Sequence, residues 1–102
     1  MKKQHAVAVL AALSQPVRLE VFLLLAHTLP DGMASGEIAI ATASSPNTMS
    51  AHLAILSRAG LVKSVKVGRN VVYRAVRRPV NDLAMLLTEV SLTDRTERDA
   101  SG

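Results

Sequence analysis

Residues 45 to 51 carry small side chains suited to close, hydrogen-bonded contact with another molecule. Asn47, Thr48 and Ser50 offer amide or hydroxyl groups, and Ala51 adds almost no bulk. At about 100° per residue, Asn47 and Ala51 fall on the side of a helix opposite its apolar residues, with Thr48 and Ser50 on the flanks. A helix face that meets only water usually carries Glu and Lys. These short groups instead suit the reading of base edges in a DNA major groove, which is about 12 Å wide.

The start of the same helix adds a contact of a second kind. Ser45 is expected to be the N-cap and Pro46 the first helical residue. The hydroxyl of Ser45 and the unpaired N–H groups of the first turn can hold a phosphate. His52 lies at the edge of the apolar stripe, where DNA contact or local packing is expected rather than metal binding.

Positive charge is concentrated in one segment. The chain has a net charge of +4, yet no acidic residue lies between Glu37 and Asp82. The same interval holds seven basic residues: Arg58, Lys63, Lys66, Arg69, Arg74, Arg77 and Arg78. Such a segment attracts polyanions and gains from counterion release, although a solvated basic face is an alternative. We expect Arg58, Lys66 and Arg69 to anchor DNA.

The common patterns of catalytic and metal sites do not occur in the sequence. There is no cysteine, which excludes disulfides and thiolate metal sites in this chain. A Gly-rich phosphate loop, a nucleophile elbow and an HExxH motif are all missing. His5 and His27 lie far apart in sequence and are expected on the surface or in packing. We predict that the chain is not an enzyme and that it binds no metal or cofactor.

Three helices are expected before residue 45. Hydrophobic spacing predicts helices over Gln4–Leu13, Pro16–Thr28 and Ala34–Ala43. Ser14 is expected to be the N-cap of the second helix, which ends at the turn signal Pro30–Gly32. In the third helix, Ile38 and Ala41 are expected to face inward.

The polar helix and the elements after it complete the pattern. Met49, Leu53 and Leu56 form its core stripe, and Gly60 follows its end. The runs LVKSVKV and VVYRAV, joined by GRN, predict a hairpin. Pro79 is expected to break the second strand, before a last helix over Val80–Leu92.

The fold class predicted is mainly α with a β-hairpin wing. It is a winged helix-turn-helix with four helices, two strands and a final helix over residues 1–92, followed by a polar, flexible tail over 93–102.

The first and last helices carry apolar stripes that suit a dimer interface or, equally, the protein's own core. The candidate interface residues are Ala6, Val9, Leu10, Leu13, Leu83, Leu86, Leu87 and Val90.

The segments ALSQPVRLEVFLLL, NTMSAHLAILSRAGLV and VGRNVVYRAV resemble the ArsR/SmtB family of bacterial winged-helix repressors. The resemblance covers about Leu10 to Leu92, and its most specific part is Ser50-Ala51-His52-Leu53. It implies a homodimer, joined through the first and last helices, that represses its own operon and leaves DNA when an inducer binds.

The positions where members of that family bind inducers differ here. Arsenic-type members carry thiolates on the third helix, where this chain has residues such as Ala34, Gly36 and Ala39. Zinc-type members use carboxylate and imidazole ligands on the last helix, where this chain has Asp82 and Glu89 but no histidine. The inducer stays open, and a thiolate-bound metal is not expected.

We predict a dimeric, cytoplasmic repressor that binds an inverted repeat in double-stranded DNA. A winged-helix module for protein–protein assembly and a nonspecific architectural DNA-binding protein are the alternatives. The basic segment disfavours the first, since protein interfaces deplete Lys. A membrane partner is not expected, because no apolar run approaches the roughly 20 residues of a spanning helix. The N-terminal MKKQHAVAVLAAL looks like a signal peptide but is expected to be the first helix of the domain.

Overall fold

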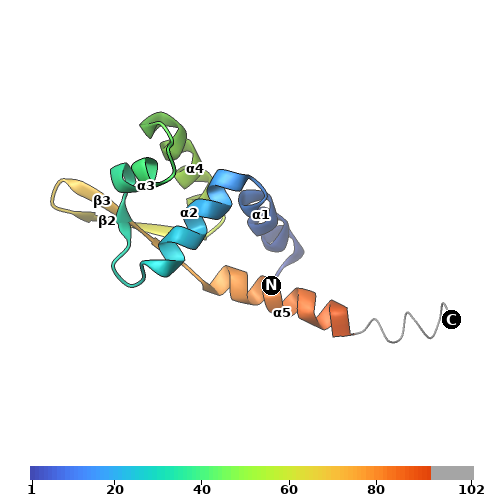
Figure 1. The fold of residues 1–102 in the computed structure, drawn as a ribbon. Helices are drawn as coiled ribbons and strands as arrows, with labels where there is room; N and C mark the ends of the chain where they lie inside the picture. Colours follow the sequence, from blue (N-terminus) through green and yellow to red (C-terminus); the bar gives the residue numbers. More distant parts are fainter. Residues whose placement is uncertain (93–102) are drawn as a thin grey trace.

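The computed structural model describes residues 1–92, in five helices and a small antiparallel sheet (Figure 1). The predicted tail, residues 93–102, lies outside the described residues. In chain order the elements are α1 (Lys3–Leu13), α2 (Pro16–His27), β1 (Met33–Ala34), α3 (Ser35–Ala41), α4 (Pro46–Arg58), β2 (Val62–Val67), β3 (Asn70–Ala75) and α5 (Arg78–Leu92). The predicted winged helix-turn-helix is confirmed.

The sheet holds the hairpin predicted from sequence and one strand that was not predicted. The strand order is β1-β3-β2, with Met33 opposite Tyr73 and Val62 opposite Ala75. β1 has only two residues, too few for the alternating pattern that marks a strand in sequence. Its pairing with β3 ties the segment after α2 to the base of the hairpin.

The core is aliphatic and lies between α1, α2, α3, α4 and the base of the hairpin. Val9, Leu25, Ile38, Leu53 and Leu61 are among its fully buried side chains. The predicted α4 stripe of Met49, Leu53 and Leu56 is buried as expected. Since α1 supplies part of this core, it is an integral element of the domain.

Three local predictions were wrong. Gln15, not Ser14, caps α2, because its side chain accepts a hydrogen bond from the Arg18 N–H at 2.9 Å. Ser14 instead ends α1 and donates its hydroxyl to the Ala11 carbonyl at 2.8 Å. Ala41 is exposed, and Ala39 takes the inward position beside Ile38.

The third error concerns Pro79. β3 ends at Ala75, four residues earlier, and α5 begins at Arg78. Pro79 is therefore the second residue of α5, where a missing N–H breaks no helical hydrogen bond.

Two turns take left-handed backbone conformations. Gly32, just before β1, has a φ of +76°, and an added Cβ there would lie against the Tyr73 carbonyl oxygen. Ala43, between α3 and α4, has a φ of +53°, which is uncommon for a residue with a side chain. Both turns set the angle at which a neighbouring element leaves.

No single helix among residues 1–92 is long and apolar enough to cross a membrane. α1 and α2 together pass by length and composition, but they are bent by 99° at the break between them.

Candidate nucleic-acid interface

The helix-turn-helix consists of α3, a tight turn and α4. The turn is closed by hydrogen bonds from the Ser44 N–H to the Ala39 carbonyl, at 2.9 Å, and from the Thr42 hydroxyl to the Ile38 carbonyl, also at 2.9 Å. These bonds use the carbonyls at the end of α3 and leave α4 projecting from the body of the molecule (Figure 1).

The outward face of α4 is polar, uncharged and accessible through its first turns. Asn47, Thr48, Ser50 and Ala51 are all exposed, while Met49 between them is buried. This alternation follows from the helical period, since the apolar residues recur every three or four positions. The face offers short hydrogen-bonding groups near its start and the Arg58 guanidinium at its end.

The first turn of α4 is only partly available to a ligand. The Ser45 hydroxyl accepts from the Thr48 N–H at 3.2 Å and donates to the Thr48 hydroxyl oxygen at 2.8 Å. Pro46 has no N–H. Among the described residues, the N–H of Asn47 therefore stays without an acceptor, and it points along the helix start where an anion is favoured.

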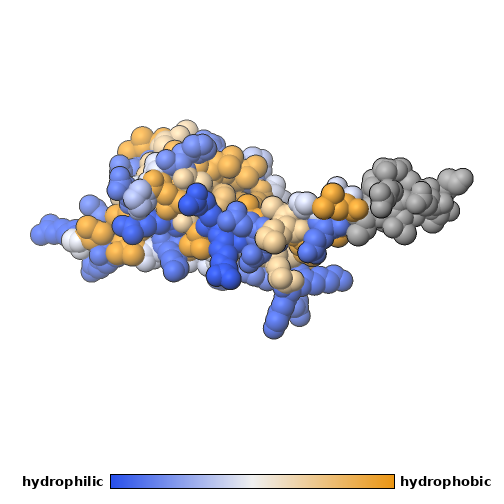
Figure 2. Space-filling view, turned by 90° about the horizontal axis from the view of Figure 1, so that it is seen from below, coloured by the Kyte–Doolittle hydropathy of each residue, from blue (hydrophilic) through white to orange (hydrophobic). Residues whose placement is uncertain are grey.

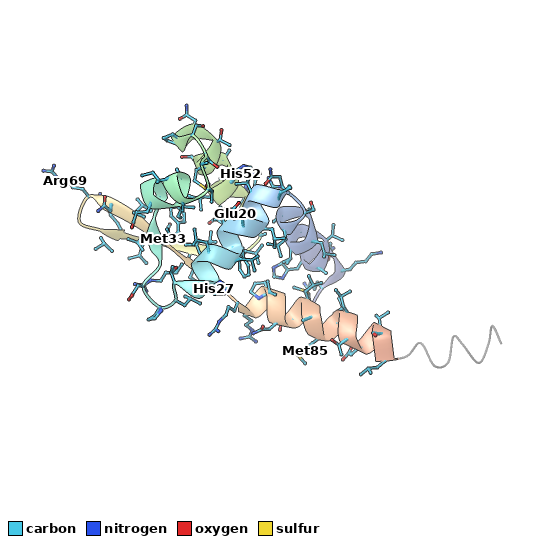
Figure 3. All side chains as sticks on the ribbon, viewed as in Figure 1. Glu20, His27, Met33, His52, Arg69 and Met85 are labelled. Carbon is cyan, nitrogen blue, oxygen red and sulfur yellow. The ribbon has the colours of Figure 1, made fainter. Side chains whose placement is uncertain are left out.

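The wing is a two-residue hairpin that carries basic side chains away from the helices. Gly68 and Arg69 form its turn, and Gly68 has the positive φ, +62°, that a type II′ turn requires at its first position. Arg69 projects outward from this tip, away from the body of the protein (Figure 3). Lys66, near the end of β2, is also exposed.

The charges of the wing repel one another. Lys63 and Arg74 are directly opposite on β2 and β3, an arrangement that is unfavourable for like charges. Within residues 1–92, no basic side chain of the segment from 58 to 78 makes an ion pair with a carboxylate. A polyanionic partner supplies the missing counter-charge.

Two side chains that sequence did not single out connect α4 to the N-terminal helices. Arg18 of α2 lies with its Nη1 3.5 Å from Nδ1 of His52, which is half-buried on α4. His5 of α1 lies with its Nε2 3.2 Å from the carbonyl oxygen of Ala59, just past α4. Their partners are 34 and 54 residues away, so no local pattern could have revealed these contacts.

The predicted dimer residues divide into two groups. Ala6, Val9 and Leu83 are buried in the protomer's own core, so they have little surface left for a partner. Leu13 and Leu86 are half-buried against that core. Leu10, Leu87 and Val90 are 47%, 51% and 60% exposed. Hydrophobic side chains reach the surface at the far end of α5 (Figure 2).

The comparison with known proteins agrees with this geometry. A family model described as a helix-turn-helix domain matches residues 13–65, over half of the chain. An ArsR-like transcriptional regulator from a Rhodococcus strain is 31% identical, with a TM-score of 0.82 over 95% of this chain and 89% of that one. None of the curated proteins matches the chain in sequence.

Two further solved structures extend the comparison. One is the homodimeric winged helix-turn-helix DNA-binding domain of a possible ArsR-family regulator from Mycobacterium bovis, 28% identical, with a TM-score of 0.69 over 86% of this chain and 80% of that one. The other is reduced HlyU from Vibrio cholerae, 26% identical, with a TM-score of 0.68 over 91% and 88%. Fold and interface thus define a winged helix-turn-helix, DNA-binding transcriptional regulator. The chain belongs to the ArsR family of such regulators, a family that is generally not enzymatic.

Proposed function

We propose that the protein is a homodimeric repressor that binds an inverted repeat in double-stranded DNA. The observation that carries this proposal is the exposed face of α4, which is polar and uncharged, beside a wing with unpaired basic side chains. In each protomer, Asn47, Thr48, Ser50 and Ala51 enter the major groove and contact base edges. His52 supports this helix from the side, and Ser45 with the first turn of α4 meets a phosphate.

The basic residues have the positioning role. Arg58 at the end of α4, and Lys66 and Arg69 on the wing, contact the sugar–phosphate backbone or the edge of the adjacent groove. These contacts bind all sequences alike, whereas the α4 side chains select among them.

The dimer is supported by the direction of the α5 stripe. It begins in the core at Leu83 and continues to Leu87 and Val90, beyond the part of α5 that the protomer covers. Leu10 and Val7, which is 57% exposed, add apolar surface on α1, the helix that packs against α5. A twofold interface pairs this surface with itself and places two α4 helices about 34 Å apart, the spacing of successive major grooves.

Selection from random duplex DNA tests the proposal against its alternatives. An inverted repeat with half-sites one helical turn apart is the expected result, and the regulated DNA would be in the cytoplasm. Enrichment of bent or A·T-rich DNA without a motif would indicate an architectural protein. The absence of any binding would indicate a protein–protein module.

A further inference from the structure

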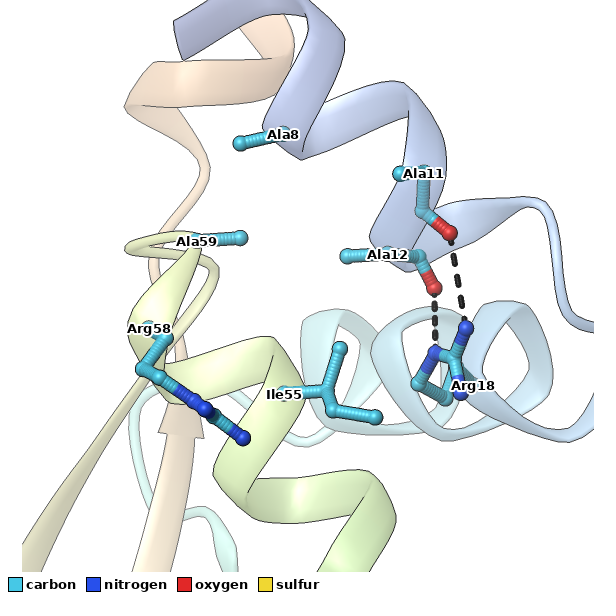
Figure 4. A pocket seen from close by; sticks show the side chains of 7 residues that line it. All are labelled: Ala8, Ala11, Ala12, Arg18, Ile55, Arg58 and Ala59. Carbon is cyan, nitrogen blue, oxygen red and sulfur yellow. Dashed lines mark hydrogen bonds between the residues drawn. The ribbon is translucent and has the colours of Figure 1, made fainter.

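A hollow of about 350 Å³ opens between α1, α2 and α4, beside the recognition helix (Figure 4). Its apolar walls are methyl groups of α1, namely Ala8, Ala11 and Ala12, and side chains at the end of α4, namely Ile55 and Ala59. The volume falls at the lower end of the range for small-molecule pockets, which is about 300–1,000 Å³.

Arg18 stands at one side of the hollow and is held in place by three acceptors. It donates through Nε to the Ala12 carbonyl at 2.7 Å, through Nη2 to the Ala11 carbonyl at 3.4 Å and through Nη1 toward His52 at 3.5 Å. A guanidinium has five N–H groups, so two of them have no acceptor among residues 1–92. The group is fixed and still has donors to offer.

Arg58 stands at the other side (Figure 4). Its one hydrogen bond within residues 1–92 is from Nε to the Ala54 carbonyl of its own helix, at 3.4 Å. Neither arginine forms an ion pair with a carboxylate in the described part of the chain. The hollow therefore combines two guanidinium groups without counter-charge and a wall of small apolar side chains.

We propose that this hollow binds a small organic carboxylate with a compact apolar body. A guanidinium matches the two oxygens of a carboxylate through paired hydrogen bonds, and the alanine methyls suit a short aliphatic or aromatic group. A DNA phosphate can reach Arg58, but it has no apolar part to fill the space between the alanines. The apolar walls therefore favour a carboxylate over the DNA backbone.

Binding in the hollow has a consequence for DNA, and this consequence rests on the proposed function. Arg58 anchors DNA in that proposal, and Arg18 contacts the recognition helix through His52. A carboxylate that engages both arginines competes with the DNA backbone for Arg58 and draws Arg18 away from His52. The ligand is then an inducer that needs no thiolate.

The site is tested first without DNA. Methyl NMR spectra of the full chain are recorded during titration with benzoate and with hexanoate, and with benzamide as the uncharged match for benzoate. Both carboxylates should shift the Ala8, Ala12 and Ile55 methyl signals saturably, and benzamide should not. Arg58→Gln should weaken carboxylate binding by on the order of 10- to 100-fold, the range for hydrogen bonds to charged groups.

Filling the hollow gives the second variant. Ala8→Leu should abolish carboxylate binding, whereas Ala84→Leu, at an exposed alanine of α5, should leave it unchanged. Equal shifts with benzamide, shifts that persist in Ala8→Leu, or no saturable shift with either carboxylate would overturn the proposal. A loss of dimer in Ala8→Leu, with no carboxylate bound by the unaltered protein, would show that the hollow receives a second copy instead.

The DNA experiment separates this site from the proposed function. Benzoate should release the unaltered protein from DNA but not Ala8→Leu. If neither protein binds DNA while benzoate still binds the hollow, the site stands and the proposed function fails.

Discussion

Replacing Leu87 on α5 should weaken self-association without unfolding the protein. Leu87 is 51% exposed in the protomer, so about half of its surface remains to be covered by a partner. Complete burial of a leucine side chain contributes about 1.5–3 kcal/mol, and the remaining half contributes about 1 kcal/mol. A twofold interface contains Leu87 twice. Leu87→Ala should therefore cost about 2 kcal/mol, which is roughly a 30-fold rise in the dimer dissociation constant.

Sedimentation equilibrium over a range of protein concentrations measures this constant. Leu10→Ala, at a side chain 47% exposed on α1, should behave like Leu87→Ala. Ile40→Ala is the matched control, because Ile40 is 84% exposed on α3 and lies outside the α1 and α5 surface. Thermal unfolding monitored by circular dichroism confirms that each variant is folded.

The result would contradict the proposed interface if Leu87→Ala and Leu10→Ala both kept the dissociation constant of the unaltered protein. A monomer at micromolar concentration that still binds DNA with full affinity would contradict the dimer itself.

The remaining predictions concern stability and induction. Leu53→Ala should lower the free energy of unfolding by about 2–5 kcal/mol in urea denaturation, because Leu53 is 1% exposed and its removal leaves a cavity. Gly32→Ala should cost about 2 kcal/mol or more in the same assay, since a Cβ at a φ of +76° would also lie 2.8 Å from Cγ of Arg74. One equivalent of arsenite, cadmium or zinc should not release the protein from DNA in fluorescence anisotropy, because the sequence has no cysteine and the described residues include no group of three or more histidines and acids able to hold a metal. Release by zinc or arsenite would refute this last prediction.

Local patterns in the sequence were sufficient for the recognition helix and the wing. Pro46 and Gly60 mark the ends of α4 through backbone conformations that few residues favour, and the structure has α4 from Pro46 to Arg58 with Gly60 at a φ of +78°. The hairpin followed from two β-rich runs around Gly68. These signals act within a few residues, so they can be read without knowing the tertiary fold.

Contacts between distant segments could not be predicted in this way. Gln15 and Ser14 are both competent caps, and which of them ends a helix depends on how α1 and α2 meet. The hollow exists because α1 packs across the end of α4 with alanines on the facing side. The division of the α5 stripe into a buried part at Leu83 and an exposed part at Leu87 depends on where the protomer ends, which periodicity does not contain.

The most direct test of the central proposal compares specific and nonspecific DNA affinity at matched salt for Asn47→Ala and Arg69→Ala. Asn47→Ala should cost about 1–3 kcal/mol at the selected inverted repeat and much less on random DNA, so the affinity ratio should fall. Arg69→Ala should weaken binding to both DNAs alike, and the salt slope should fall by about one unit for each phosphate that the substitution leaves without its arginine. If Arg69→Ala collapsed the ratio while Asn47→Ala left it intact, the wing rather than α4 would read the sequence, and the assignment of roles would be reversed.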